Sequence, residues 1–251
     1  MAPSAQQQRV ASMGATVRWN RFGTPHVVAN PGGFVAEGLS ADPVQAAREW
    51  IVSRSDLFGL SAEAVAALEV VRVAPIGAGR AVMLRQRFGG LPSGIDGTVD
   101  VAVIEGNVAY VSSSLTRDTT LAGEVRLTAE EAVGAAAADI GQSVGASAVV
   151  ASADGAEWTV LDVEGLDQPV HARLVAVPTP LDGVRPAWET VVLDPAASEG
   201  FSHLVDAETG EVLVRTDLVD HAQADQSRPA TRTRSRRRSA TTSTRPSPTC
   251  S

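Results

Sequence analysis

Lysine is absent from this 251-residue sequence, so all 21 of its basic residues are arginine. The only cysteine is Cys250, which excludes an intrachain disulfide. Aromatic residues make up 4% of the chain and hydrophobic residues 44%, so the core has to be built mainly from Val, Leu, Ile and Ala. No apolar run approaches the roughly 18 residues that a membrane-spanning helix needs, and the sequence therefore predicts no membrane span.

Charge is distributed unevenly along the chain. Residues 221–251 carry seven arginines and one acid, a balance of +6, whereas residues 1–220 carry 14 arginines and 28 acids, a balance of −14. An acidic body disfavours nucleic acid as a partner, because contacts to phosphate need positive potential. The tail contains no Val, Leu, Ile, Met or aromatic residue, and it is predicted to be disordered, as is the polar segment 1–14.

The stretch from Arg80 to Leu115 predicts three antiparallel strands. Val, Leu, Gln and Phe occupy every second position over residues 82–88, which is the period of a strand with one buried face. The same alternation returns in two later runs, 99–103 and 108–112. We expect Gly106 and Asn107 to supply the positive φ of the turn between these runs, and residues 89–92 (Gly-Gly-Leu-Pro) to form a shaped break after the first strand.

Signals for a helix start occur at three places. Each is a side-chain acceptor at the N-cap position, namely Asp42, Ser61 and Thr128. The first and third are completed as capping boxes by a Gln or Glu three residues later. The sequence therefore predicts a helix from Pro43 that ends before residue 59, a short helix over 62–68, and an Ala-rich helix that begins at residue 129 and ends at Gly141.

Extended segments flank these helices. Short strands are expected over 16–19, 25–29 and 69–74, and a second set over 158–163, 170–177, 187–193, 201–206 and 211–216. Helices grouped with antiparallel sheets indicate the α+β class. A helix followed by a sheet occurs twice, so we predict two consecutive domains, 15–118 and 119–220, with disordered ends at 1–14 and 221–251.

Three sequence patterns that form catalytic or metal-binding sites in other proteins lack, in this chain, the surrounding residues or elements that such sites require. Residues 141–145 match the G-x-S-x-G nucleophile elbow around Ser143, with Asp194 and His203 downstream, but a helix precedes the serine where a strand is required. The four histidines include no H-E-x-x-H pair, so no catalytic zinc site is predicted. The acidic stretch 206–210 lacks the ligand spacing of a calcium loop and predicts a hairpin turn.

Three segments of the sequence resemble known protein families. The central segment, RQRFGGLPSGIDGTVDVAVIEGNVAYVSSSL, resembles the FTP domain, the fungalysin/thermolysin propeptide module, in which a Gln precedes a Gly-rich bend. The preceding AREWIVSRSDLFGLSAEAVAALEV is similar to the helix and L-x-G-L-S segment of that family. The later AWETVVLDPAASEGFSHLVDAETGEVLVRTDLV resembles a PepSY domain ending in its hairpin. The resemblance spans about residues 15–220.

The resemblance implies a cystatin-like FTP domain followed by a PepSY domain, without the catalytic domain. The implied function is that of a non-enzymatic inhibitor and folding chaperone for a secreted zinc metallopeptidase, with no cofactor and a monomeric state in isolation. It implies an extracellular location, although residues 1–10 show no signal peptide. We predict Arg85, Arg87, Phe88 and Leu91 as peptidase contacts, with closure of the core as an equal explanation for the two apolar residues.

Two other functions stay open at this point, namely a stand-alone PepSY-type binding protein and a hydrolase that uses Ser143. The abrupt change of composition near His221 also suggests a shifted reading frame, because Arg, Pro, Ser, Thr and Ala are common products of a displaced frame in GC-rich DNA. We therefore expect the chain to be a truncated peptidase precursor. Translation of the DNA beyond codon 220 in all three frames tests this: an H-E-x-x-H motif should appear in another frame.

Overall fold

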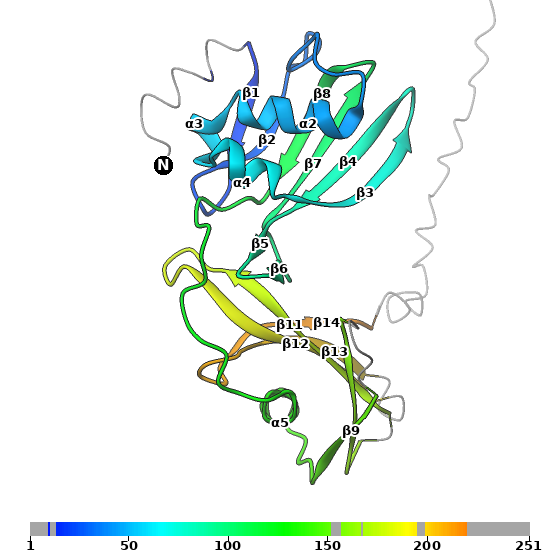
Figure 1. Ribbon diagram of the computed structural model, residues 1–251. Helices are drawn as coiled ribbons and strands as arrows, with labels where there is room; N and C mark the ends of the chain where they lie inside the picture. Colours follow the sequence, from blue (N-terminus) through cyan, green and yellow to red (C-terminus); the bar gives the residue numbers. More distant parts are fainter. Residues whose placement is uncertain (1–9, 11–13, 152–156, 167, 195–198, 220–251) are drawn as a thin grey trace, which may run out of the picture. The chain divides into compact units, whose positions relative to one another are not determined.

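The structure is a computed structural model that describes residues 10, 14–151, 157–166, 168–194 and 199–219 (Figure 1). The predictions of disorder concern segments that lie outside the described residues, apart from Val10 and Gly14. In the part of the chain that the structure describes, none of the helices has the length and apolar character needed to cross a bilayer.

The first sheet has six strands in the order β1-β2-β8-β7-β4-β3, and all neighbours are antiparallel. It forms because valines alternate with small or polar residues along its central strands, so that one face is apolar. Its strands are β1 (Thr16–Trp19), β2 (Pro25–Ala29), β3 (Glu69–Ile76), β4 (Gly79–Arg85), β7 (Thr98–Ile104) and β8 (Asn107–Ser113).

Three helices pack on the apolar face of this sheet: α2 (Pro43–Val52), α3 (Ser55–Phe58) and α4 (Ala62–Ala66) (Figure 1). Trp50 and Phe58 are fully buried and meet edge to face in this core, with ring centroids 5.7 Å apart. The predicted cap of α2 is confirmed, since Asp42 accepts from the backbone N–H of Gln45. The predicted capping box is not made, because the Gln45 side chain donates to Glu49.

Two turn details differ from the sequence prediction. Between β7 and β8 the residues with positive φ are Glu105 (49°) and Gly106 (74°), not Gly106 and Asn107. The register pairs Ile104 with Asn107, so only two residues remain for the turn and both must take positive φ. The predicted break at 89–92 is a second tight hairpin, in which β5 (Arg87–Phe88) and β6 (Leu91–Pro92) flank two glycines of positive φ.

The second sheet is a meander of six antiparallel strands in the order β14-β13-β12-β11-β10-β9. Its strands are β9 (Ser147–Ala151), β10 (Thr159–Val163), β11 (Val170–Pro178), β12 (Val184–Asp194), β13 (Glu199–Asp206) and β14 (Val212–Asp217). Five of them were predicted, and β9 was not.

Helix α5 (Ala129–Asp139) packs on the second sheet through its buried alanines and Val133 (Figure 1). Its capping box is confirmed, because Thr128 Oγ1 accepts from the Glu131 N–H while Glu131 accepts from the Thr128 N–H. Gly141, with φ of 75°, follows the C-cap as predicted.

The described residues therefore confirm a sheet-rich α+β architecture. The division into domains at residues 118 and 119 stays a prediction. A small cluster contains Phe88, Leu91 and Leu121 together with Ala176 and Val184 of the second sheet.

Candidate partner-binding site

The four predicted contact residues lie in different environments. Phe88 is 1% exposed within the small cluster described above, and Leu91 is half-buried against the same cluster. The burial of Phe88 favours the alternative in which this residue closes the core. Arg85 and Arg87 lie nearer to solvent, and both bind one carboxylate oxygen of Glu69, at 3.1 and 3.0 Å.

Glu69 is the shared partner of these two arginines. Burial on its own would raise the pKa of Glu69, but the hydrogen bonds from Arg87 and Arg85 outweigh it and leave the pKa below its ordinary value. Arg87 also donates to the backbone oxygen of Gly90, so this arginine fastens the β5–β6 turn. Arg85 and Arg87 are therefore held in place by contacts within the chain.

A second polar network, in the second sheet, was not predicted. It begins with Asp206, the last residue of β13, whose Oδ1 accepts from the backbone N–H groups of Glu208 and Thr209, both at 2.9 Å. Gly210, with φ of 80°, donates its N–H to the Asp206 carbonyl. The stretch 206–210 is thus the predicted hairpin turn, and the aspartate shapes it from inside.

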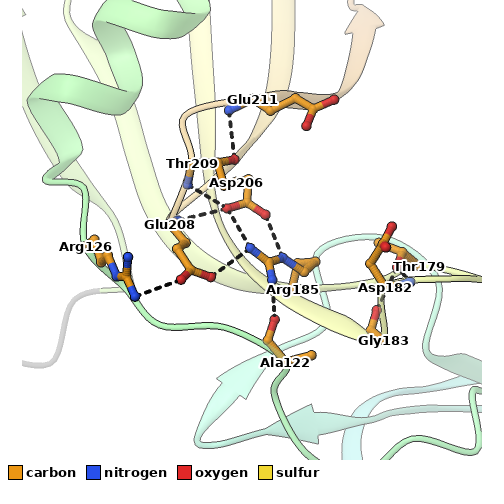
Figure 2. A network of polar contacts seen from close by, with 10 residues as sticks. All are labelled: Ala122, Arg126, Thr179, Asp182, Gly183, Arg185, Asp206, Glu208, Thr209 and Glu211. Carbon is orange, nitrogen blue, oxygen red and sulfur yellow. Dashed lines mark hydrogen bonds and ion pairs between the residues drawn. The ribbon is translucent and has the colours of Figure 1, made fainter.

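Arg185 of β12 holds this turn from the neighbouring strand (Figure 2). Its Nε donates to Asp206 Oδ2 at 2.8 Å, its Nη2 to Asp206 Oδ1 at 3.2 Å and to Glu208 Oε2 at 2.9 Å, and its Nη1 to the carbonyl of Ala122 at 2.7 Å. Four of the five guanidinium N–H groups thus donate to partners within the chain. Arg185 therefore connects β12 with the Asp206 turn and with the backbone at Ala122.

The carboxylate at the centre of this network is only 4% exposed. Burial would raise the pKa of Asp206, but the hydrogen bonds from Arg185 and from the two turn amides lower it below its ordinary value. The pKa of Arg185 is raised, chiefly by its hydrogen bond to Asp206. Both groups are therefore held in their charged forms at neutral pH.

The β11–β12 loop lies beside the Asp206 turn, and residues of both line a hollow of about 280 Å³. This loop, residues 179–183, is closed by Thr179 (Figure 2). The Thr179 N–H and Oγ1 both donate to the Gly183 carbonyl, at 2.8 and 2.9 Å, and Oγ1 accepts from the Asp182 N–H at 3.0 Å. At its tip Leu181 is 92% exposed, which is the highest value among the exposed large hydrophobic residues of the described part of the chain.

The serine elbow pattern does not have the geometry of an elbow. Ser143 is exposed in the loop between α5 and β9, so a helix precedes it and a strand follows it, the reverse of the required order. His203 is fully buried, with Nε2 3.5 Å from Asp139 Oδ2. This histidine faces α5.

No group of three or more His, Cys, Asp or Glu side chains is arranged to hold a metal ion within the described ranges. The charged neighbours of the buried His203 are Asp139 and Arg215, which form an ion pair with each other at 2.9 Å. Burial lowers the pKa of His203 below its ordinary value, so the imidazole is held neutral.

Sequence comparison finds no match to any family model and none to any curated protein. Among solved structures, a similar chain is the Bacillus megaterium YpeB C-terminal domain, with 13% sequence identity and a TM-score of 0.33. The match covers 78% of this chain and 73% of that one. A likeness of this size does not extend to function.

Sequence reasoning missed Arg185 and Leu181. Arg185 stands in a strand with no motif around it, and its partner Asp206 is a neighbour only because β12 and β13 pair. Leu181 had a detectable signal, since Asp182-Gly183 is a turn dipeptide that leaves the preceding leucine at a loop tip.

Proposed function

We propose that this chain is a non-catalytic interaction module of the propeptide type, which inhibits a secreted fungalysin-like zinc metallopeptidase and assists its folding. The order of the FTP-like and PepSY-like segments supports the proposal at the level of sequence. The observation that carries it is the exposed Leu181 on its closed loop.

An apolar side chain held outward on a fixed loop is suited to enter a concave apolar site of a partner. Exposing leucine to water is unfavourable in the unbound chain, and its burial by a partner recovers about 25 cal/mol for each Å² of apolar surface. The loop loses little conformational freedom on binding, because Thr179 already closes it with three hydrogen bonds. Single exposed leucines are common, but this one is almost completely exposed at the tip of an ordered hairpin.

The neighbouring turn strengthens this argument. Arg185 joins the start of β12 to the Asp206 turn and to Ala122, so the base of the loop is anchored to two other segments of the chain (Figure 2). A loop on a rigid base can present the same conformation to the peptidase during folding and after it. This is the property that templating of a folding partner requires.

The experiment uses the full chain and a purified fungalysin-like zinc metallopeptidase, with a fluorogenic peptide as the reporter of cleavage. We expect concentration-dependent inhibition, and a higher yield of active enzyme when the denatured peptidase domain is refolded with the chain present. A refolding control with an equal mass of serum albumin excludes a nonspecific effect. Stable binding without inhibition or rescue would favour the stand-alone PepSY-type module, and no binding would refute the proposal.

A further inference from the structure

Strand β3 forms one edge of the first sheet, and among the described residues its one partner strand is β4. It is eight residues long, and four of its apolar side chains are well exposed: Val70 (42%), Val71 (42%), Val73 (40%) and Ile76 (53%). An edge strand presents unpaired backbone N–H and C=O groups on its outer side. Exposed β-branched residues along such an edge form a template for pairing with another extended chain.

Two features limit the part of this edge that can pair. A β-bulge interrupts the ladder between Val70 and Arg72, and Pro75 has no N–H to donate. Between them the backbone of Arg72, Val73 and Ala74 continues in regular register with β4. The usable window is therefore short, and side-chain contacts have to contribute to any binding.

The charge around this window is opposite to that of the rest of the body. Residues 69–92 contain four arginines and one acid, whereas the remaining residues of 1–220 contain ten arginines and 27 acids. Arg72 and Arg80 are exposed on β3 and at the start of β4. The one acid of the segment, Glu69, is already paired with Arg85 and Arg87. Asp100 lies in the same row across the sheet as Arg72.

We propose that the β3 edge is a docking site for an extended, acidic segment of a partner protein, which adds a strand beside Arg72–Ala74. The partner's apolar side chains contact Val73 on one face of the strand, and its carboxylates face Arg72 on the other face, because neighbouring residues of a strand point to opposite sides. Main-chain hydrogen bonds supply the affinity in this mode, and the alternate side chains supply the specificity. The site is independent of the Leu181 loop and of the proposed peptidase inhibition.

Charge argues against two other occupants. A second copy of the chain pairing through the same edge would bring two arginine-rich edges together, and like charges placed opposite each other are destabilising. The tail of this chain, with seven arginines and one acid in residues 221–251, has the same sign as the edge. An acidic strand is the complementary partner.

The probe is a fluorescein-labelled eight-residue peptide in which Glu alternates with Val or Thr, and binding to the full chain is followed by fluorescence anisotropy at low salt. We expect saturable binding that is lost when alternate backbone nitrogens of the peptide are methylated, because one edge of the peptide can then no longer donate. We expect Arg72→Glu to weaken binding at least about tenfold, since it replaces an attraction by a repulsion. Arg18→Glu changes an exposed arginine on β1, at the opposite edge of the same sheet, and should leave the dissociation constant within about twofold.

Several outcomes would overturn the proposal. These are no binding up to about 1 mM peptide, equal binding of the methylated peptide, or equal weakening by Arg72→Glu and Arg18→Glu. Displacement of the methylated and unmethylated peptides alike by a heparin oligosaccharide would indicate a general polyanion site. A dimer that Arg72→Glu dissociates in sedimentation analysis would assign the edge to a second copy. Thermal unfolding of both variants establishes that the fold is retained.

Discussion

The side-chain amide of Gln86 pairs with both backbone groups of Thr116, a residue that follows it by 30 positions. Nε2 donates to the Thr116 carbonyl at 2.9 Å, and Oε1 accepts from the Thr116 N–H at 2.9 Å. Gln86 is 5% exposed, and its own backbone bonds to Gly97 and Ser93. The neutral amide of one side chain thus joins the end of β4 to the segment that follows β8.

Replacing Gln86 by Leu should destabilise the chain by about 2–4 kcal/mol, because the buried N–H and C=O of Thr116 would both lose their partner. Urea denaturation followed by circular dichroism measures the change. Gln45→Leu is the matched control, since the Gln45 side chain donates to Glu49 on the exposed surface of α2, and we expect a change within about 0.5 kcal/mol. Equal effects of the two substitutions would contradict the structural role of Gln86.

Arg185→Met should cost about 2–4 kcal/mol of unfolding free energy, because it leaves the buried carboxylate of Asp206 without its cationic partner. Arg126→Met tests the same chemistry at the surface: Arg126 also binds Glu208, at 3.0 Å, but it is 62% exposed. Its loss should cost at most about 0.5 kcal/mol. A comparable effect of the two substitutions in urea denaturation would show that Arg185 does not hold the turn.

Stability should fall as the pH drops below 6.5, the ordinary pKa of histidine, because of His203. Burial lowers the pKa of His203, while Asp139 acts to raise it and Arg215 to lower it further. Between 6.5 and the lowered value, the unfolded chain takes up a proton that the folded chain does not. The unfolding free energy therefore decreases by up to about 1.4 kcal/mol per pH unit in this range.

The comparison is between the wild type, His203→Leu and the exposed-site control His171→Leu, each unfolded by urea at several pH values from 7.5 to about 5. The His203→Leu protein should show a flatter dependence than the wild type, and His171→Leu should keep the wild-type slope. An unchanged slope in His203→Leu would assign the acid sensitivity to other groups.

Local chemistry was sufficient to predict much of the fold. Asp42 and Thr128 cap helices because the capping acceptor and its donor are three residues apart. The alternation that begins at residue 82 identifies the buried face of β4, but the predicted continuation to residue 88 is wrong, because β4 ends at Arg85 and residues 87–88 form β5 of a separate two-stranded sheet. The positive φ of Glu105 was missed because the β7–β8 register, and not the propensity of Asn107, selects the turn residues.

The polar contacts that organise the candidate site could not be predicted in the same way. Arg185 and Asp206 are 21 residues apart, and Gln86 and Thr116 are 30 apart. Whether such residues meet depends on the strand order and on the exact path of the connecting segments. From the sequence alone, an arginine in a strand that pairs with a buried carboxylate cannot be distinguished from one that is exposed to solvent.

The measurement that tests the central claim most directly is the inhibition constant of two leucine variants against the fungalysin-like peptidase. Leu181→Ser removes the exposed side chain at the loop tip, and Leu218→Ser removes another exposed leucine, 49% accessible, beyond β14. If Leu181 enters the peptidase, its loss should weaken inhibition by about tenfold or more, while Leu218→Ser stays within about twofold of the wild type and both variants unfold at the wild-type temperature. Full inhibition by Leu181→Ser would contradict the account.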